Sequence, residues 1–246
     1  MKEIAISVEN VKKSFKIYKD KGYTLKERIL FFKSRNAYVK NNILRGISFD
    51  IEKGDILGIV GKNGSGKSTL LKLITKIIYP DSGNIKINGK VSSLIELGAG
   101  FHPDMTGREN IYINASIYGL TKKEIDSKLD TIIKFSELEE FIDSPIRTYS
   151  SGMYMRLAFS VTINVKADIL LIDEILSVGD ANFQAKCFRK MQELKDSGIT
   201  IVIVSHDLHT MKMLCNKAIW IESGKIKESG NADTVISKYL DETMNN

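Results

Sequence analysis

The segment that most constrains the fold is GKNGSGKST, residues 61–69, which follows directly on the apolar run ILGIV at 56–60. It matches the pattern G-x-x-x-x-G-K-[ST] and lies between a predicted buried strand and a predicted helix, STLLKLITKII, which we expect to stop at Pro80. A glycine-rich backbone can wrap around a phosphate with its N–H groups pointing inward, and the N-terminus of the next helix adds positive potential. The segment therefore predicts a phosphate-binding loop in a chain of alternating strands and helices.

The groups of this loop have separate expected contacts. Lys67 would reach the β- and γ-phosphates of a nucleotide, Ser68 would ligate Mg²⁺, and Thr69 would add a further phosphate contact. Lys67 also counts among the predicted catalytic residues. The predicted nucleotide-binding residues of the loop are Gly61, Asn63, Gly64, Ser65, Gly66, Lys67, Ser68 and Thr69.

The run DILLIDE, which ends at Glu174, predicts the second half of a nucleotide site. Its apolar residues form a core strand that delivers Asp173 to the strand end, beside the phosphate loop, where a carboxylate can hold Mg²⁺ through water. Glu174 follows and would orient or deprotonate an attacking water. An acidic pair at a strand end can also cap the next helix. The phosphate loop upstream favours catalysis.

Apolar periodicity along the chain predicts an α/β fold with a mostly parallel sheet. Alternating apolar residues at 4–11 and 43–51 predict two strands of an antiparallel sheet. A largely helical stretch runs from about 106 to 165, and from 168 onward buried strand, helix and buried strand alternate, before a hairpin across Ser223-Gly224 and a short helix, TVISKYL. Such alternation places helices on both faces of a parallel sheet.

The positive charge of the chain is concentrated near its N-terminus. Residues 1–40 carry eleven Lys and Arg against four Asp and Glu, whereas residues 41–246 carry 25 against 26. Within an insertion at 16–42, Leu25, Ile29 and Phe32 have helical spacing among basic residues, which predicts a short amphipathic helix. Such a helix suits an anionic partner, either nucleic acid or a lipid headgroup surface, but a solvated basic face that packs its aromatics on the core is the equal alternative.

The chain carries no predicted membrane span or secretory signal. Its longest apolar runs, such as ILLI and ITIVIV, are far shorter than the ~20 residues that a span needs. The first residues, MKEIAISVEN, lack an apolar signal core. We therefore expect a cytosolic chain in which both cysteines, Cys187 and Cys215, are reduced and buried.

The order of these motifs resembles the ATP-binding subunits of ABC transporters over nearly the whole chain. A phosphate loop is followed by a helical lobe, by YSSGM about twenty residues before the acidic strand, and by VSHD after a later strand. YSSGM takes the place of the signature Leu-Ser-Gly-Gly-Gln of that family, with Ser150 and Gly152 retained. The resemblance implies that these two residues bind the γ-phosphate of ATP held by a second copy, so that ATP joins a homodimer.

The resemblance assigns further roles. Ser177 and Asp180, in SVGD, resemble the loop that links the two sites of the dimer, and His206 resembles the switch histidine that contacts the γ-phosphate. Two positions depart from the family pattern. Members of the family usually have a Gln here that touches Mg²⁺, but the sequence LIELGAGFHP contains none. Glu96 is the nearest polar candidate for that role. An alignment without a gap places Leu97 at the position of the Gln. The aromatic that stacks on adenine is best matched by Phe15, while Tyr18, Tyr23 and Tyr38 lie in the insertion.

The resemblance also implies the domain plan. The chain would be a single ABC ATPase domain, 1–246, with a P-loop NTPase core of the RecA-like type in 1–96 and 166–246, including an N-terminal antiparallel β subdomain. The helical subdomain would span 97–165, and the basic insertion 16–42.

Within the family, the chain is similar to the ATPase subunits that export lipid-linked polysaccharides such as O-antigen and teichoic acid. The similarity rests on ELGAGFHPDMTGREN, YSSGMYMRLAFS and DEILSVGDANFQAKC. It implies ATP and Mg²⁺ as cofactors, a separate transmembrane permease as partner, and a peripheral position on the cytoplasmic face of the membrane, with the insertion near the lipid headgroups. Many members carry a further C-terminal carbohydrate-binding domain; since this chain ends at Asn246, we expect it not to bind the glycan terminus.

Two other functions fit less of the sequence. A nucleic-acid- or ribosome-associated ATPase of the same superfamily would use the basic N-terminus on phosphate backbones, but such proteins usually carry two ATPase modules or a long coiled-coil insertion. A phosphoryl-transferring kinase built on the same loop would leave YSSGM and SVGD without a purpose. We therefore expect no nucleic-acid partner.

Overall fold

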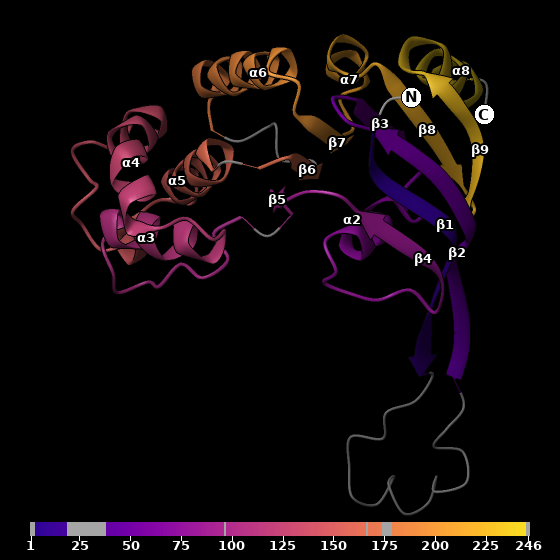
Figure 1. Cartoon of the computed structure of the whole chain (residues 1–246), viewed down its shortest axis with the longest axis horizontal. Coiled ribbons are helices and arrows are strands. Elements are labelled where there is room, and N and C mark those ends of the chain that lie inside the picture. The colour runs from indigo at the N-terminus through magenta and orange to yellow at the C-terminus, as the bar shows by residue number, and fades with distance from the viewer. Residues whose placement is uncertain (1–2, 19–37, 96, 166, 174–178, 245–246) are drawn as a thin grey trace, which may run out of the picture.

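A six-stranded sheet lies at the centre of the computed structural model, which describes residues 3–18, 38–95, 97–165, 167–173 and 179–244 (Figure 1). Its strands run in the order β5 (Val91–Ser93), β6 (Ile169–Asp173), β7 (Thr200–Val204), β3 (Ile56–Val60), β8 (Lys217–Glu222) and β9 (Lys225–Asn231). Neighbouring strands from β5 to β8 are parallel, and β9 returns antiparallel to β8. The predicted α/β fold with a mostly parallel sheet is confirmed.

Both faces of this sheet are covered, which is why its strands are apolar throughout. Leu170 and Ile172 pack on one side, where helices α6 (Ala181–Asp196), α7 (Leu208–Leu214) and α8 (Ala232–Met244) lie (Figure 1). The alternate residues Ile169 and Leu171 pack on the other side, with helix α2 (Lys67–Ile74). Successive side chains of a strand point to opposite faces, so a doubly covered strand excludes polar residues.

A second, antiparallel sheet of three strands has the order β2 (Tyr38–Glu52), β1 (Ile4–Tyr18) and β4 (Ser82–Ile87). The predicted strands at 4–11 and 43–51 were too short, because the pairing of β1 with β2 continues to Tyr18 opposite Tyr38. The ends of the insertion, 16–18 and 38–42, are therefore strand, and they project as a two-stranded ribbon away from the rest of the molecule (Figure 1). The helix predicted around Leu25, Ile29 and Phe32 lies outside the described residues.

Helices α3 (Gly107–Ile117), α4 (Lys122–Ser136) and α5 (Ser151–Asn164) lie together at one side of the central sheet (Figure 1). They share an apolar cluster with its own members, among them Ile111, Ile132 and Leu157. A short 3-10 helix, Ile146–Thr148, precedes α5. The sequence around Thr106 and Thr121 explains where α3 and α4 start, since both threonines form capping boxes with a glutamate three residues later.

Two predicted boundaries were wrong, and one helix was not predicted. Helix α2 ends at Ile74 rather than continuing to Pro80, and Lys76 has a positive φ of 59° that no helix accommodates. Apolar residues in VSSLIEL predict a strand over that whole run, but β5 stops at Ser93. Helix α7 was not predicted, because its seven residues are too few to show a period.

A buried ion pair joins the amino ends of β3 and β8. The Asp55 side chain is 1% exposed, and its carboxylate lies 2.7 Å from the Lys217 ammonium. Asn216 links the same ends, since it donates to Asp55 and accepts from the backbone of Ile56. Burial opposes ionisation of Asp55, but the hydrogen bonds from Lys217 and Asn216 outweigh it and keep the pKa of Asp55 below its usual value. This edge is thus fixed by charge and hydrogen bonds.

Cys187 and Cys215 are both buried and form no disulfide, as predicted. Burial raises the pKa of each thiol to about 12. Within the described ranges, no helix is long and apolar enough to cross a membrane.

Candidate nucleotide-binding site

The order of the parallel strands brings the predicted site residues to one edge of the sheet. Ile59 of β3 is in register with Val204 of β7, and Val204 is in register with Asp173 of β6. Two strand spacings, about 10 Å, therefore separate Asp173 from the strand that leads into the phosphate loop. His206 follows β7, the strand between them, and its side chain is exposed. Ligands of open α/β sheets bind at such an edge.

The phosphate loop holds its lysine in place with its own backbone. Lys67 is 7% exposed, and its ammonium donates to the carbonyl oxygens of Gly61, at 2.7 Å, and Lys62, at 3.2 Å. The loop is tightened by a hydrogen bond from the Ser65 N–H to the Lys62 carbonyl, at 3.1 Å. The positive charge of Lys67 therefore lies at the loop itself, where a phosphate would enter.

Gly66 shows why this loop needs glycine. It is the N-cap of α2 with φ at +112° and makes no side-chain capping bond. A Cβ atom at this position would lie 2.6 Å from Cδ2 of Leu44. Only glycine fits both the backbone conformation and the space. The N–H groups that open α2 are thus left to the loop and to whatever it binds.

The serines and the aspartate suit a phosphate with Mg²⁺. The Ser65 hydroxyl is buried and makes no hydrogen bond to any residue that the structure describes, which fits a partner that enters the loop. Ser68 is exposed in the first turn of α2, and Asp173 is half-buried at the end of β6. Mg²⁺ takes oxygen ligands and needs only one or two from the protein beside phosphates and water. The donor set present here fits that ion.

The second predicted contact region is the N-terminus of α5. Ser150 is its N-cap, and the Ser150 hydroxyl accepts a hydrogen bond from the Met153 N–H at 3.2 Å. Ser150 and Ser151 are exposed, and Gly152 is half-buried. A Cβ atom at Gly152 would meet only the Ser150 hydroxyl, at 3.8 Å. Ser150 therefore caps its own helix, and the exposed start of the helix is accessible to a partner.

Asp180, predicted in the loop that links the two sites, is the N-cap of α6 and accepts from the Phe183 N–H at 2.9 Å. Its other carboxylate oxygen lies 2.7 Å from the Arg156 guanidinium. The Phe183 N–H and then Arg156 hold the pKa of Asp180 below its usual value. Asp180 therefore has a structural task in its own chain, whatever it contacts in a second copy.

Phe15, the predicted adenine-stacking aromatic, lies on β1 with 42% of its surface exposed. The neighbouring Ser14 is tied to Asp81, which accepts from the Ser14 N–H at 2.8 Å and from its hydroxyl at 2.5 Å. Lys13 adds an ion pair to Asp81 at 3.0 Å. These bonds from Ser14 and Lys13 lower the pKa of Asp81 to about 2. The strand is thereby held with the Phe15 ring open to solvent.

Three predicted site residues, Glu96, Glu174 and Ser177, lie outside the described residues. Their described neighbours lie at the edge that carries the phosphate loop: Leu94 donates to Leu171 at 2.8 Å beside the end of β6, and Asp173 ends that strand.

Tyr154 and Arg156, two α5 residues that contact the turn at 98–101 and the start of α6, were not predicted from the sequence. Arg156 pairs with Glu137 as well as Asp180, and the Tyr154 hydroxyl donates to the Gly98 carbonyl at 3.3 Å. One signal was available: Arg156 is a lone charge in the apolar run MYMRLAFSV, and a charge in a buried helix requires a partner.

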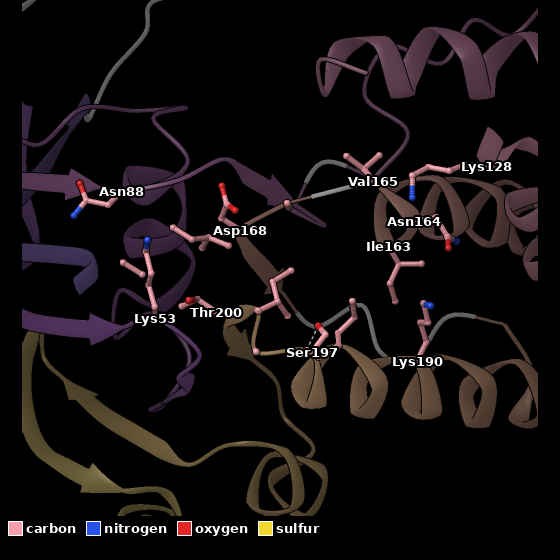
Figure 2. Close-up of a pocket in the computed structure, with 16 residues that line it drawn as sticks. Lys53, Asn88, Lys128, Ile163, Asn164, Val165, Asp168, Lys190, Ser197 and Thr200 are labelled. Atoms are coloured by element: carbon pink, nitrogen blue, oxygen red, sulfur yellow. Dashed lines mark hydrogen bonds between the residues drawn. The ribbon is translucent and has the colours of Figure 1, made fainter. Parts of the chain in front are cut away.

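A cavity of about 460 Å³ lies along the opposite edge of the sheet, where β6 and β7 begin (Figure 2). Two of its lysines, Lys53 and Lys190, form ion pairs with Glu3 and Glu193. Asp168, near the centre of Figure 2, accepts from the Lys90 N–H at 2.7 Å. The cavity is across the sheet from the phosphate loop and has no part in the predicted site.

Comparison with known proteins identifies related sequences. A profile of the family described as ABC transporter matches residues 44–177. The chain is 51% identical over 242 residues to the O-antigen export system ATP-binding protein RfbB of Myxococcus xanthus, covering 96% of this chain but 55% of that protein. It is 44% identical to the O-antigen export system ATP-binding protein RfbB of Klebsiella pneumoniae, and the match covers 96% of this chain and 98% of that protein. It is 43% identical to the teichoic acids export ATP-binding protein TagH of Levilactobacillus brevis, and the match covers 97% of this chain and 65% of that protein.

Solved structures share the fold. An ATP binding subunit of an ABC transporter has a TM-score of 0.77 at 23% identity, covering 97% of both chains. A dimeric ATP-binding cassette in a post-hydrolysis state, bound to ADP and Pi, has a TM-score of 0.72 at 20% identity, covering 92% of this chain and 98% of that one. At these identities the likeness concerns the fold alone.

Proposed function

The chain belongs to the ABC transporter family, and from this premise we propose that it is the ATP-hydrolysing subunit of an exporter of lipid-linked polysaccharide. The observation that carries ATP hydrolysis is the placement of the phosphate loop, His206 and Asp173 at the ends of three neighbouring strands. A nucleotide in the loop would lie with its terminal phosphate towards the acidic strand. The export cargo is inferred from relatives named for O-antigen and teichoic acid export.

Each group of the chain has a task in this reaction. The α2 N-terminus and Lys67 bind the phosphates, which places the γ-phosphate for in-line attack by water. Glu174 orients or deprotonates that water, and His206 contacts the γ-phosphate from the intervening strand. Phe15 stacks on adenine. No covalent bond to the protein forms, so positioning and charge do most of the catalysis.

Ser68 and Asp173, with Glu96 as a weaker candidate, would hold Mg²⁺. When bound, the ion would neutralise charge on the β- and γ-phosphates.

We assign the exposed start of α5 to the nucleotide of a second copy. Helix N-termini attract anions, and Ser150 and Gly152 are the residues retained from the family signature. A homodimer with ATP at each interface would close on binding and loosen on hydrolysis. Substituting Ser150→Arg should block dimerisation but leave nucleotide binding by the monomer unchanged; normal dimerisation of this variant would reduce YSSGM to a helix cap.

The proposed partner is a membrane permease, with the helical surface near 97–120 as the coupling face and the chain held peripherally at the cytoplasmic side. Exposed Ile117 and Met105 give this face apolar contact area. The basic insertion 16–42 would lie near the anionic headgroups of the membrane and of the cargo. Deleting residues 22–40 should spare basal ATP hydrolysis and impair export.

The deciding experiment is affinity capture of the Glu174→Gln variant from detergent-solubilised native membranes with ATP and Mg²⁺. This variant should bind ATP and hydrolyse it about 100-fold or more slowly, because general-base catalysis contributes on that order. Recovery of a multi-spanning permease with polyprenyl-linked sugar supports the proposal, and Lys67→Ala, which should bind ATP weakly, is the matched control. Recovery of ribosomes or nucleic acid would contradict the export function.

A further inference from the structure

Two side chains of α5 contact two other segments of the chain: Tyr154 contacts the turn at 98–101, and Arg156 contacts residues 179–180 at the start of α6. Tyr154 and Arg156 are two residues apart, so their side chains leave the helix about 200° from each other. The Tyr154 hydroxyl donates to the Gly98 carbonyl at 3.3 Å, and its ring meets Phe101 edge-on at 5.3 Å. This side of α5 thus contacts the turn that follows Glu96 in the chain.

The opposite side of α5 contacts the loop that follows Glu174. The Arg156 guanidinium donates to Asp180 at 2.7 Å and to Glu137 at 3.0 Å, and lies 4.9 Å from the centre of the Phe183 ring. The Arg156 side chain is 19% exposed, so water screens its pairs less than at an open surface. Asp180 also accepts from the Phe183 N–H at 2.9 Å, so its carboxylate connects Arg156 to the first turn of α6.

Both contacts depend on a glycine in the loop. Gly98 and Gly179 each have φ at +75°, a conformation that glycine adopts most readily. A Cβ atom at Gly98 would overlap the Tyr154 hydroxyl, and one at Gly179 would lie 3.2 Å from Nε of Arg156. Each loop therefore approaches its α5 side chain as closely as the backbone allows.

We propose that Tyr154 and Arg156 are positioning residues that couple the Ser150–Gly152 start of α5 to the two loops, so that contact with the nucleotide of a second copy adjusts the chain's own site. This inference rests on the proposed function. The coupling passes through a rigid element: the Tyr154 N–H donates to the Ser150 carbonyl at 2.9 Å, so residue 154 moves with the helix start.

The test uses the full chain in the Glu174→Gln background, where hydrolysis does not consume ATP. Tyr154→Phe removes only the hydroxyl, and Arg156→Lys keeps the charge but loses the paired geometry. Each should raise the ATP concentration at half-maximal dimerisation, measured by analytical ultracentrifugation, by about fivefold or more, the lower end of typical coupling between sites. Nucleotide affinity of the monomer, measured with Ser150→Arg added, should change less than about twofold, well under that coupling.

The matched control is Glu137→Gln, which removes the other carboxylate partner of Arg156 but does not touch either loop. It should leave the dimerisation midpoint unchanged. The coupling would be contradicted if both test variants kept the wild-type ATP concentration at half-maximal dimerisation, or if the control shifted it equally. Tyr154 and Arg156 would then only stabilise the fold. Thermal melting of each variant shows whether its shift comes from a folding defect. Gly179→Ala adds a methyl group beside the Arg156 guanidinium and should reproduce the shift of Arg156→Lys. If Glu174→Gln alone does not dimerise with ATP, the proposed function fails instead.

Discussion

The two helix N-termini of the proposed site, at α2 and at α5, are built in opposite ways. The start of α2 is buried, begins with a glycine and has no side-chain cap. The start of α5 is exposed, begins with a serine and uses that serine to bind its own Met153 N–H. Both offer backbone N–H groups, but only the first is enclosed by its own chain. An enclosed terminus can hold an anion alone, whereas an open one needs a second surface to exclude water.

The largest effect is expected from Lys67→Ala. Hydrogen bonds to charged groups contribute about 1.5–3 kcal/mol, so the loss of this lysine should weaken ATP binding by about 10- to 100-fold. Isothermal titration calorimetry measures this, with exposed Lys62→Ala as the control. An unchanged ATP affinity of Lys67→Ala would mean that the enclosed start of α2 does not hold the nucleotide through this lysine.

Gly66→Ala should destabilise the fold by about 1–3 kcal/mol, because the new Cβ is strained at φ +112° and meets Leu44. Chemical denaturation measures this change in the free energy of unfolding. Gly64→Ala is the control: its φ is +78°, but no heavy atom lies within 4 Å of the added Cβ. Its cost should be limited to about 1 kcal/mol of backbone strain. Equal costs would show that the close packing around Gly66 has no importance.

Ser150→Ala should cost about 1 kcal/mol through the lost cap. Ser150→Asp keeps a capping oxygen, so stability should be retained, while its negative charge should oppose a phosphate from the second copy. Thermal melting and ATP-dependent dimerisation, measured on both variants, separate the two roles. Dimerisation of Ser150→Asp at the normal ATP concentration would remove the anion-binding role from α5.

The smallest effect concerns Asp81, which binds Ser14, the residue before Phe15 on β1. Its pKa in the folded chain, about 2, is below the ordinary 3.8, so the carboxylate stabilises the fold above about pH 4 and loses this effect as pH falls towards 2. Asp81 is 39% exposed, so Asp81→Asn should cost less than about 1 kcal/mol at pH 7. Urea unfolding at pH 7 and pH 3 tests this: the difference between wild type and variant should shrink at the lower pH.

Local features of the sequence predicted the enclosed terminus well. The flanking strand β3, the phosphate loop and helix α2 are contiguous in the chain, so a local pattern was enough to predict all three. The family and the fold class were also predicted and are confirmed. The parallel sheet followed from the alternation of strands and helices, but its strand order, with β7 between β6 and β3, was not predicted. The roles of individual site residues stay predictions.

Features that depend on distant partners were not predictable. Tyr154 meets a carbonyl 56 residues away and Arg156 a carboxylate 24 residues away, and neither spacing leaves a periodic signal. The ribbon ends of β1 and β2 pair with each other across the insertion, between residues about twenty positions apart in the chain. Strand β5 contributes three residues, too few to define an alternation.

The burial of both cysteines makes the wild-type chain unreactive towards thiol probes. Burial raises the pKa of each thiol to about 12, and the thiolate is the form that attacks a maleimide, so neither cysteine should react readily near pH 7. A cysteine introduced at an exposed residue outside the proposed interface, such as Ser127 of α4, would therefore take a fluorophore or spin label in preference to the native cysteines. Distances between two such labels would follow the closing and opening of a dimer during turnover, without prior removal of native cysteines.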